Sequence, residues 1–170
     1  ENAMSAQQST NPTAQLAIEG WFETDPEPAL IGSRCIGSGT YFFPPTDTSR
    51  APGHAGGATE PVRLSTRGTL WSYTSAGYQP PAPYIEPPGG FEPFAIAAVE
   101  LAEEGLVVLG QVPSDVGMAD LKVGMEMELV IDTLFVDDDG ERVVWKWRPA
   151  ANTTASSNAT ASGPAEEAAQ

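Results

Sequence analysis

Short apolar runs, each closed by residues typical of turns, form the dominant pattern along this chain. The clearest pair is Phe94–Leu101 and Leu106–Val112, joined by Ala102-Glu103-Glu104-Gly105. Both runs contain β-branched residues and are short, which favours two strands over a helix. Gly105 supplies the positive φ that a short hairpin loop needs. The pattern therefore predicts a β-hairpin, with which the other strands of the chain are expected to pair.

Three further stretches show the alternation of half-buried strands. Val62–Ser75 and Met125–Val136 alternate apolar and polar positions, and Val143–Arg148 follows as the last strand. Gly68, in the middle of the first stretch, predicts a bulge or a sharp coil of the strand. Asp137-Asp138-Asp139-Gly140 is typical of a hairpin turn, with Gly140 in the left-handed region. The pattern thus gives five strands in all.

The predicted fold class is mainly β, a five-stranded Greek-key barrel of the oligonucleotide/oligosaccharide-binding (OB) type over residues 62–149. One helical turn is expected near Met118–Gly124, before the fourth strand. An immunoglobulin-like sandwich would need about seven strands, and there is no room for two more. Residues 18–61 are expected to hold a short helix and a ribbon-like segment. Residues 1–17 and 150–170 are poor in large apolar side chains, which predicts disordered tails.

The first aromatic side chains, Trp21 and Phe22, are expected on the short helix, which Pro26 and Pro28 would soon end. Two interpretations remain open for this pair. The side chains either enter the core of this domain, which is slightly favoured, or cover a surface of a partner protein.

The segment Arg34–Pro45 has the outline of a zinc-ribbon knuckle, with a thiol, a glycine turn and an aromatic strand. Zinc needs four ligands, usually in pairs at C-x-x-C spacing, and Ser38 stands where the second thiolate would be. The following segment offers only Asp47 and His54 as further ligands. The sequence therefore predicts a metal-free remnant of a ribbon, with no bound metal.

Five prolines lie between Tyr78 and Pro88, which predicts a stiff, extended loop over Tyr78–Pro93. Exposed tyrosines on such a loop lose little entropy on binding, so the loop is a candidate contact surface. An equally weighted alternative is that it folds over its own barrel.

The net charge is −15, from 23 acidic and 8 basic residues, which argues against a nucleic-acid partner because phosphates are neutralised by Lys and Arg. There is no apolar run of ~18 residues and no signal peptide pattern, so we expect no membrane span and a cytoplasmic location. With one cysteine, Cys35, and one histidine, His54, no nucleophile–base–orienter set can be assembled. We therefore predict no catalytic residue in this chain and no cofactor of its own.

Several motifs together resemble one known family, the rubredoxin-like zinc ribbon plus OB-fold family of acyl-CoA-associated proteins, long catalogued as a domain of unknown function. The resemblance spans roughly residues 34–149. The matching positions are Arg34, Cys35, Gly39, Phe43, Pro44 and Pro45 of the ribbon; Leu64, Ser65, Gly68, Leu70, Ser72, Tyr73 and Thr74 of the first strand; Pro93, Phe94, Val99, Glu100 and Leu101; Leu121, Gly124, Met125, Met127 and Glu128; and Arg148 with Pro149.

The resemblance implies a partner, a thiolase-like or lipid-transfer-type enzyme that makes or breaks carbon–carbon bonds on acyl-CoA thioesters. In steroid-degrading relatives the pair performs a retro-aldol cleavage of a side-chain acyl-CoA. It implies an accessory subunit that stabilises the partner and shapes the CoA channel. Ser38 replaces the second ribbon cysteine, so bound zinc is not carried over, and the hot-dog hydratase domain fused to some relatives is absent from this sequence.

On this interpretation the partner-binding surface consists of aromatic residues: Trp21, Tyr41, Phe42, Phe43, Tyr78, Tyr84 and Phe91. An acyl-CoA phosphate is expected to contact Arg63 or Arg67, an assignment made from charge alone. The alternative function is a single-stranded nucleic-acid-binding OB protein with Trp71 and Tyr73 as stacking residues. A groove that tracks phosphates needs a basic stripe, and the 8 cations of this chain are scattered.

Overall fold

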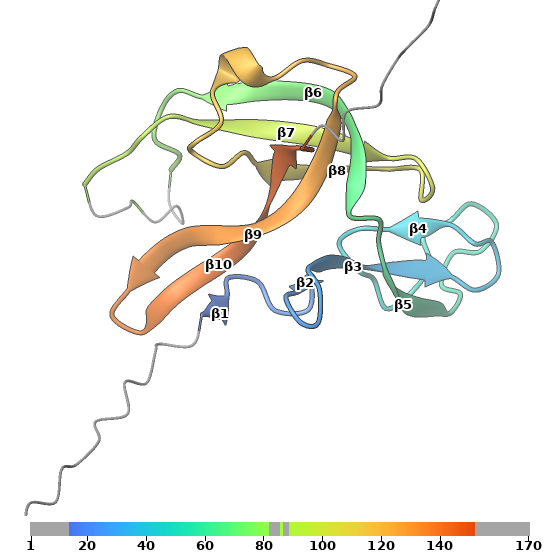
Figure 1. Ribbon diagram of the computed structural model, residues 1–170. Coiled ribbons are helices and arrows are strands. Elements are labelled where there is room, and N and C mark those ends of the chain that lie inside the picture. Colours follow the sequence, from blue (N-terminus) through green and yellow to red (C-terminus); the bar gives the residue numbers. More distant parts are fainter. Residues whose placement is uncertain (1–13, 82–85, 87–88, 152–170) are drawn as a thin grey trace, which may run out of the picture.

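A computed structural model describes residues 14–81, 86 and 89–151 (Figure 1). Five of its strands form the barrel, with the bounds β6 Arg67–Ala76, β7 Phe94–Leu101, β8 Leu106–Gln111, β9 Glu126–Asp137 and β10 Gly140–Pro149. The order β10-β8-β7-β6-β9 is closed by a β9–β10 pairing, and only the β8–β10 contact is parallel within this set. This closed, OB-like arrangement confirms the predicted mainly β fold class.

The predicted hairpin at 94–112 is confirmed. β7 and β8 pair in register from Ile96↔Gln111 to Leu101↔Leu106. Gly105 has φ of 65° and its N–H donates to the carbonyl oxygen of Leu101 at 2.9 Å, which closes the turn. Alternate residues of the hairpin face inward, and Val99 is fully buried in the barrel core.

The stretch predicted as one strand over 62–75 is divided in two. β5 (Thr59–Arg63) pairs with β3 outside the barrel, and β6 starts afresh at Arg67. Gly68 lies where β6 passes between β7 and β9, and a Cβ there would be 2.4 Å from the Glu100 carbonyl oxygen. The β6–β7 register then shifts between Leu70 and Ser72. The predicted local irregularity is present, as a close approach at Gly68 followed by a bulge.

The final hairpin and the helical turn expected near Met118–Gly124 also follow the sequence pattern. β9 and β10 are long and antiparallel, and Gly140 at their turn has φ of 126°. The loop between β8 and β9 carries one 3₁₀ turn, η1 (Met118–Asp120), and ends at Gly124 with φ of 91°. Its Asp120 carboxylate accepts a hydrogen bond from the Gly117 N–H at 2.9 Å, which fixes the start of the turn.

A small second sheet lies beside the barrel (Figure 1). It consists of β2 (Phe22–Glu23), β3 (Ala29–Cys35), β4 (Tyr41–Phe42) and β5, with β3 paired to all three others. Cys35 is buried at the end of β3, and the Gly39 N–H returns to its carbonyl oxygen at 2.8 Å. This turn lies within the segment predicted to be ribbon-like, and its relation to a zinc ribbon stays a prediction.

The prediction of a short N-terminal helix after residue 17 is wrong. β1 (Gln15–Leu16) pairs in parallel with β10, a turn follows at Gly20 with φ of 78°, and β2 pairs with β3. The backbone carbonyl of Trp21 accepts from the Ile31 N–H at 2.8 Å, so this segment obtains its hydrogen bonds from strands rather than from a helix. Because Gln15 and Leu16 form β1, the tail expected over residues 1–17 ends before Gln15. Residues 1–13 and 152–170 lie outside the described residues.

Candidate functional site

The candidate aromatic residues fall into two groups, one packed within the fold and one on its surface. Trp21 and Phe43 belong to the first group, because both contact Trp145 of β10, at ring-centroid distances of 6.3 and 5.7 Å. Phe22 is fully buried and also meets Trp145, at 5.6 Å. This cluster fastens the small sheet to the barrel, which answers the question left open for Phe22 in favour of the core of this domain.

Tyr41 and Phe42 are half-buried on β4. The Arg34 guanidinium lies 5.8 Å from the centre of the Tyr41 ring and forms an ion pair with Glu60 at 3.5 Å. This stacking holds the Tyr41 ring against the small sheet. One edge of β4 pairs with β3, so both aromatic side chains are held on an ordered strand.

The proline-rich loop contributes Tyr78, which is 77% exposed and is the most exposed aromatic residue among those that the structure describes. Phe91, at the other end of the loop, packs edge-on against Phe94 at 6.3 Å. Tyr84 lies outside the described residues. The structure thus anchors one end of the loop on the barrel and exposes Tyr78, so both interpretations of this loop keep support.

The two arginines expected to approach a CoA phosphate both hold carboxylates. Arg63 bonds Glu23 at 3.0 Å, and Arg67 bonds Glu126 and Glu128 at 3.1 and 3.2 Å. The structure records no contact between the side chain of Arg63 or Arg67 and any of the candidate aromatic residues, so these two groups do not form one site in the described part of the chain. A phosphate at either arginine would have to displace a carboxylate or share the cation with it.

The same pairing extends to most cations of the chain. Six of the eight Lys and Arg residues form ion pairs with Asp or Glu; within the described ranges the exceptions are Arg50 and Lys122. The surface therefore offers little unpaired positive charge, as the composition indicated.

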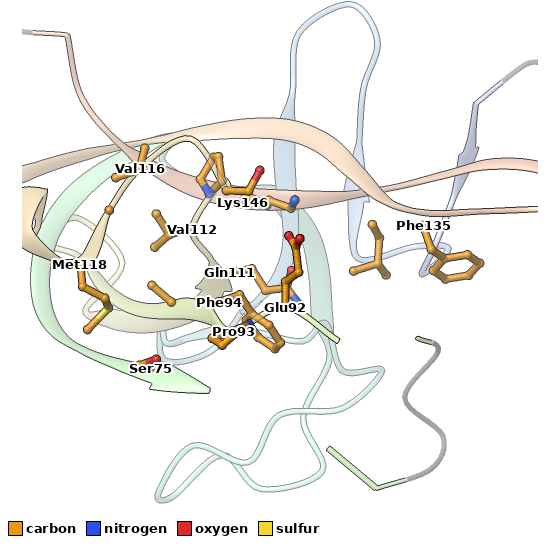
Figure 2. A pocket seen from close by; sticks show the side chains of 15 residues that line it. Ser75, Glu92, Pro93, Phe94, Gln111, Val112, Val116, Met118, Phe135 and Lys146 are labelled. Carbon is orange, nitrogen blue, oxygen red and sulfur yellow. The ribbon is translucent and has the colours of Figure 1, made fainter. Parts of the chain in front are cut away.

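A cavity of about 700 Å³ opens at one end of the barrel (Figure 2). Its wall is mostly apolar and comes from the starts and ends of several strands and from the loop before η1. Figure 2 shows Met118 and Val116 at one end, Gln111 and Glu92 near the middle, and Phe135 at the other end. Sequence reasoning missed this cavity because its wall is assembled from five strands and two loops.

Lys146 is the buried polar group of the cavity wall. Its ammonium group donates to the Asp132 carboxylate at 2.7 Å and to the Thr133 carbonyl oxygen at 3.0 Å. Burial alone would raise the pKa of Asp132, but the hydrogen bond and charge of Lys146 outweigh it and hold this pKa below 3.8. The available signal in the sequence was a lysine between Trp145 and Trp147, in the apolar part of β10 that begins at Val143.

The tip of the β7–β8 hairpin is tied to the junction between β5 and β6. One carboxylate oxygen of Glu104 accepts hydrogen bonds from the Ser65 N–H at 2.6 Å and from the Ser65 hydroxyl at 2.9 Å. The sequence placed this glutamate in the turn of the hairpin and indicated no partner for it. In the structure it holds the point where the chain leaves the small sheet and enters the barrel.

The knuckle at Cys35 has a perturbed thiol but no visible ligand set. Hydrogen bonds from Ser38, then from Ser49, lower the pKa of Cys35 to about 7, against the opposing effect of burial. His54 packs against Gly37 of the same turn. Among the residues that the structure describes, no group of three or more His, Cys, Asp and Glu side chains could hold a metal ion.

No helix in the described part of the chain is long and apolar enough to cross a membrane.

Three comparisons with known proteins all find similarity to ChsH2 or DUF35 proteins. Residues 61–132 match the model of the C-terminal OB-fold domain of ChsH2. A DUF35 domain-containing scaffold protein of Methanocaldococcus jannaschii is 27% identical over 143 residues, which cover 81% of this chain and 94% of that protein. The solved structure of an Ltp2-ChsH2(DUF35) aldolase is similar with a TM-score of 0.53 and 26% identity, over 72% of this chain and 86% of that chain. These findings support an OB fold in this chain and show its similarity to the ChsH2 and DUF35 proteins.

Proposed function

We propose that this chain is a non-catalytic OB-fold subunit of an enzyme complex that acts on acyl-CoA thioesters. The observation that carries the proposal is the similarity to the Ltp2-ChsH2(DUF35) aldolase, which extends over 86% of the matched chain. The similarity to a scaffold protein supports the same role from a second relative. The partner is a thiolase-like or lipid-transfer-type enzyme, and the two proteins form a hetero-oligomer.

The proposal assigns the chemistry to the partner. The reaction is a retro-aldol or thiolytic cleavage of a carbon–carbon bond in a bulky acyl-CoA, such as a steroid side-chain thioester. In this chain the one histidine, His54, packs against a glycine, and the thiol of Cys35 is buried. Nucleophilic catalysis requires a nucleophile and a base within hydrogen-bond reach of each other, at a place where substrate can enter. The unpaired thiol suits the reducing cytoplasm, where the proposal locates the complex.

For partner binding, the proposal relies most on Tyr78 and next on Tyr41, Phe42 and Phe91. Aromatic side chains that are partly exposed on ordered backbone are typical anchors of protein interfaces. Trp21 and Phe43 contribute by holding the small sheet in place as well as through their remaining exposed surface. Arg63 and Arg67 remain proposed contacts to a CoA phosphate, reached by exchanging their carboxylate partners.

The alternative is a single-stranded nucleic-acid binder, favoured by one observation: Trp71 is 61% exposed on the outer side of β6. Stacking on one aromatic ring is sequence-tolerant, but affinity for a polyanion depends on unpaired cations along the same groove. Arg67, the nearest cation on this strand, is held between Glu126 and Glu128. The acyl-CoA complex therefore has the stronger support.

The test is coexpression with thiolase-like or lipid-transfer-type enzymes of the same organism, followed by size-exclusion chromatography with light scattering. We expect a stable complex. Tyr78→Ala should weaken it by about tenfold or more if Tyr78 is an anchor of the interface. Val136→Ala, at a residue 56% exposed and outside the proposed surface, is the matched control and should leave affinity unchanged. Separate elution of the two wild-type proteins at micromolar concentration would contradict the proposal.

A further inference from the structure

The cavity at the end of the barrel combines an apolar wall with hydrogen-bonding groups that have capacity to spare. Lys146 has three N–H donors, of which Asp132 and Thr133 occupy two. The amide of Gln111 makes no side-chain hydrogen bond within the described residues. A volume of about 700 Å³ lies within the range of small-molecule sites, which are typically apolar with a few placed polar groups.

The wall of the cavity is held by backbone hydrogen bonds on several sides. The Val112 N–H donates to the Ala95 carbonyl oxygen at 2.9 Å, and the Val116 N–H donates to that of Pro113 at 3.1 Å. Gln111 is paired with β7 on one side and with Lys146 of β10 on the other. A site built on paired strands keeps its shape without a ligand, which lowers the entropic cost of binding.

The charges around the cavity select the kind of ligand. Asp132 already neutralises Lys146, the Glu92 carboxylate lines the cavity, and the net charge of the chain is −15, so an anion is disfavoured. An alkylammonium ion would be attracted by Glu92, but it would place a second cation in the cavity with the Lys146 ammonium group and offer no acceptor to the free Lys146 N–H. A neutral molecule with an apolar body and one hydroxyl or carbonyl oxygen satisfies both conditions.

We propose that this cavity, lined by Phe94, Gln111, Val116, Phe135 and Lys146, binds a neutral, mainly apolar small molecule or substrate portion through one oxygen. The oxygen accepts a hydrogen bond from Lys146 or Gln111, and the apolar body contacts Val116 and Phe135. The site belongs to this chain alone and does not depend on the proposed enzyme partner.

The probes are octan-1-ol, octanoate and octylamine, added to the full-length, isotope-labelled chain and followed by two-dimensional amide NMR. We expect saturable shifts for the alcohol, largest at the amides of the cavity wall, and at least tenfold weaker binding of the two charged probes. Across hexanol, octanol and decanol, affinity should rise about fourfold for each added methylene while the cavity has room. Saturation by none of the probes, tighter binding of octanoate or octylamine, or shifts centred elsewhere would each overturn the proposal.

A matched pair of variants on one strand tests the location. Ser75 lines the cavity at the end of β6, whereas Ser72 is exposed on the same strand outside it. Ser75→Trp should fill part of the space and reduce octanol affinity at least fivefold, and Ser72→Trp should not change it. Equal effects of the two variants would contradict the assignment. If Ser75→Trp does not fold, the pattern of amide shifts in the wild-type chain decides the matter.

Discussion

Replacing Gly68 by alanine tests the geometry on which the barrel depends. A Cβ at this position would lie 2.4 Å from the Glu100 carbonyl oxygen and 2.7 Å from Cγ1 of Val99. Gly68 is also paired with Met127 on β9, so β6 cannot move away from β7 without disturbing a second strand. The clash is with backbone, and an overpacked site of this kind costs about 1–3 kcal/mol.

A smaller effect of opposite sign acts on the unfolded chain, where alanine has less freedom than glycine and gains about 0.4–1 kcal/mol of stability. The net expectation is a loss of about 1–2 kcal/mol in the free energy of unfolding. With a urea dependence of about 2 kcal/mol/M, the midpoint of unfolding should fall by about 0.5–1 M.

Urea unfolding followed by tryptophan fluorescence measures this shift. Gly77→Ala is the matched control, because a Cβ at Gly77 meets no atom within 4 Å. Its midpoint should stay the same or rise slightly. An unchanged or higher midpoint for Gly68→Ala would refute the close approach of β6 and β7.

Three further predictions concern the polar contacts. Glu104→Ala removes two short hydrogen bonds from Ser65 and should cost about 1–3 kcal/mol in urea unfolding. Glu103→Ala removes only a long, exposed hydrogen bond from the Ser65 hydroxyl, at 3.4 Å, and should cost under about 0.5 kcal/mol; equal losses would contradict this. Because the folded pKa of Asp132 lies below 3.8, its contribution to stability is present above that pH and is lost as the pH falls through the folded pKa. Asp132→Asn should therefore flatten the decrease of the unfolding free energy at acid pH, and an unchanged decrease would contradict this. The Cys35 thiol should titrate near pH 7 when followed by the NMR shift of its Cβ, and a titration midpoint near 9.0 would contradict this. The free energy of unfolding should rise from about pH 7 to 9.0, because the unfolded thiol keeps its proton to a higher pH than the folded one.

Local patterns predicted the barrel well because the central hairpin consists of two short apolar runs separated by a turn sequence, and β7 and β8 have nearly the same bounds as those runs. Gly105 and Gly140 marked the two tight turns correctly, since both require positive φ. The prediction for the N-terminal segment failed because the hydrogen-bond partners of this segment lie far along the chain. Gln15 pairs with Arg142, and no local signal contains that information.

The break between β5 and β6 was missed for a related reason. Alternation continues through Leu64, Ser65 and Thr66, but Ser65 is drawn to Glu104 and β5 pairs with β3. Among the candidate site residues, the prolines near Tyr78 predicted an extended loop, and the sequence left open whether this loop is an exposed contact surface or folds over the barrel. It gave no sign that Arg63 and Arg67 would be engaged by carboxylates, since those glutamates come from other strands or loops.

The most direct test of the central proposal is an acyl-CoA cleavage assay with the thiolase-like partner, with this chain, and with both together. The account predicts cleavage only by the pair, or at least a hundredfold higher kcat/KM for the pair, and none by this chain alone. It also predicts that Tyr78→Ala lowers activity at limiting subunit concentration and that excess subunit restores it. Full activity of the partner alone would contradict the role as a required subunit, and cleavage by this chain alone would contradict the assignment of the chemistry to the partner.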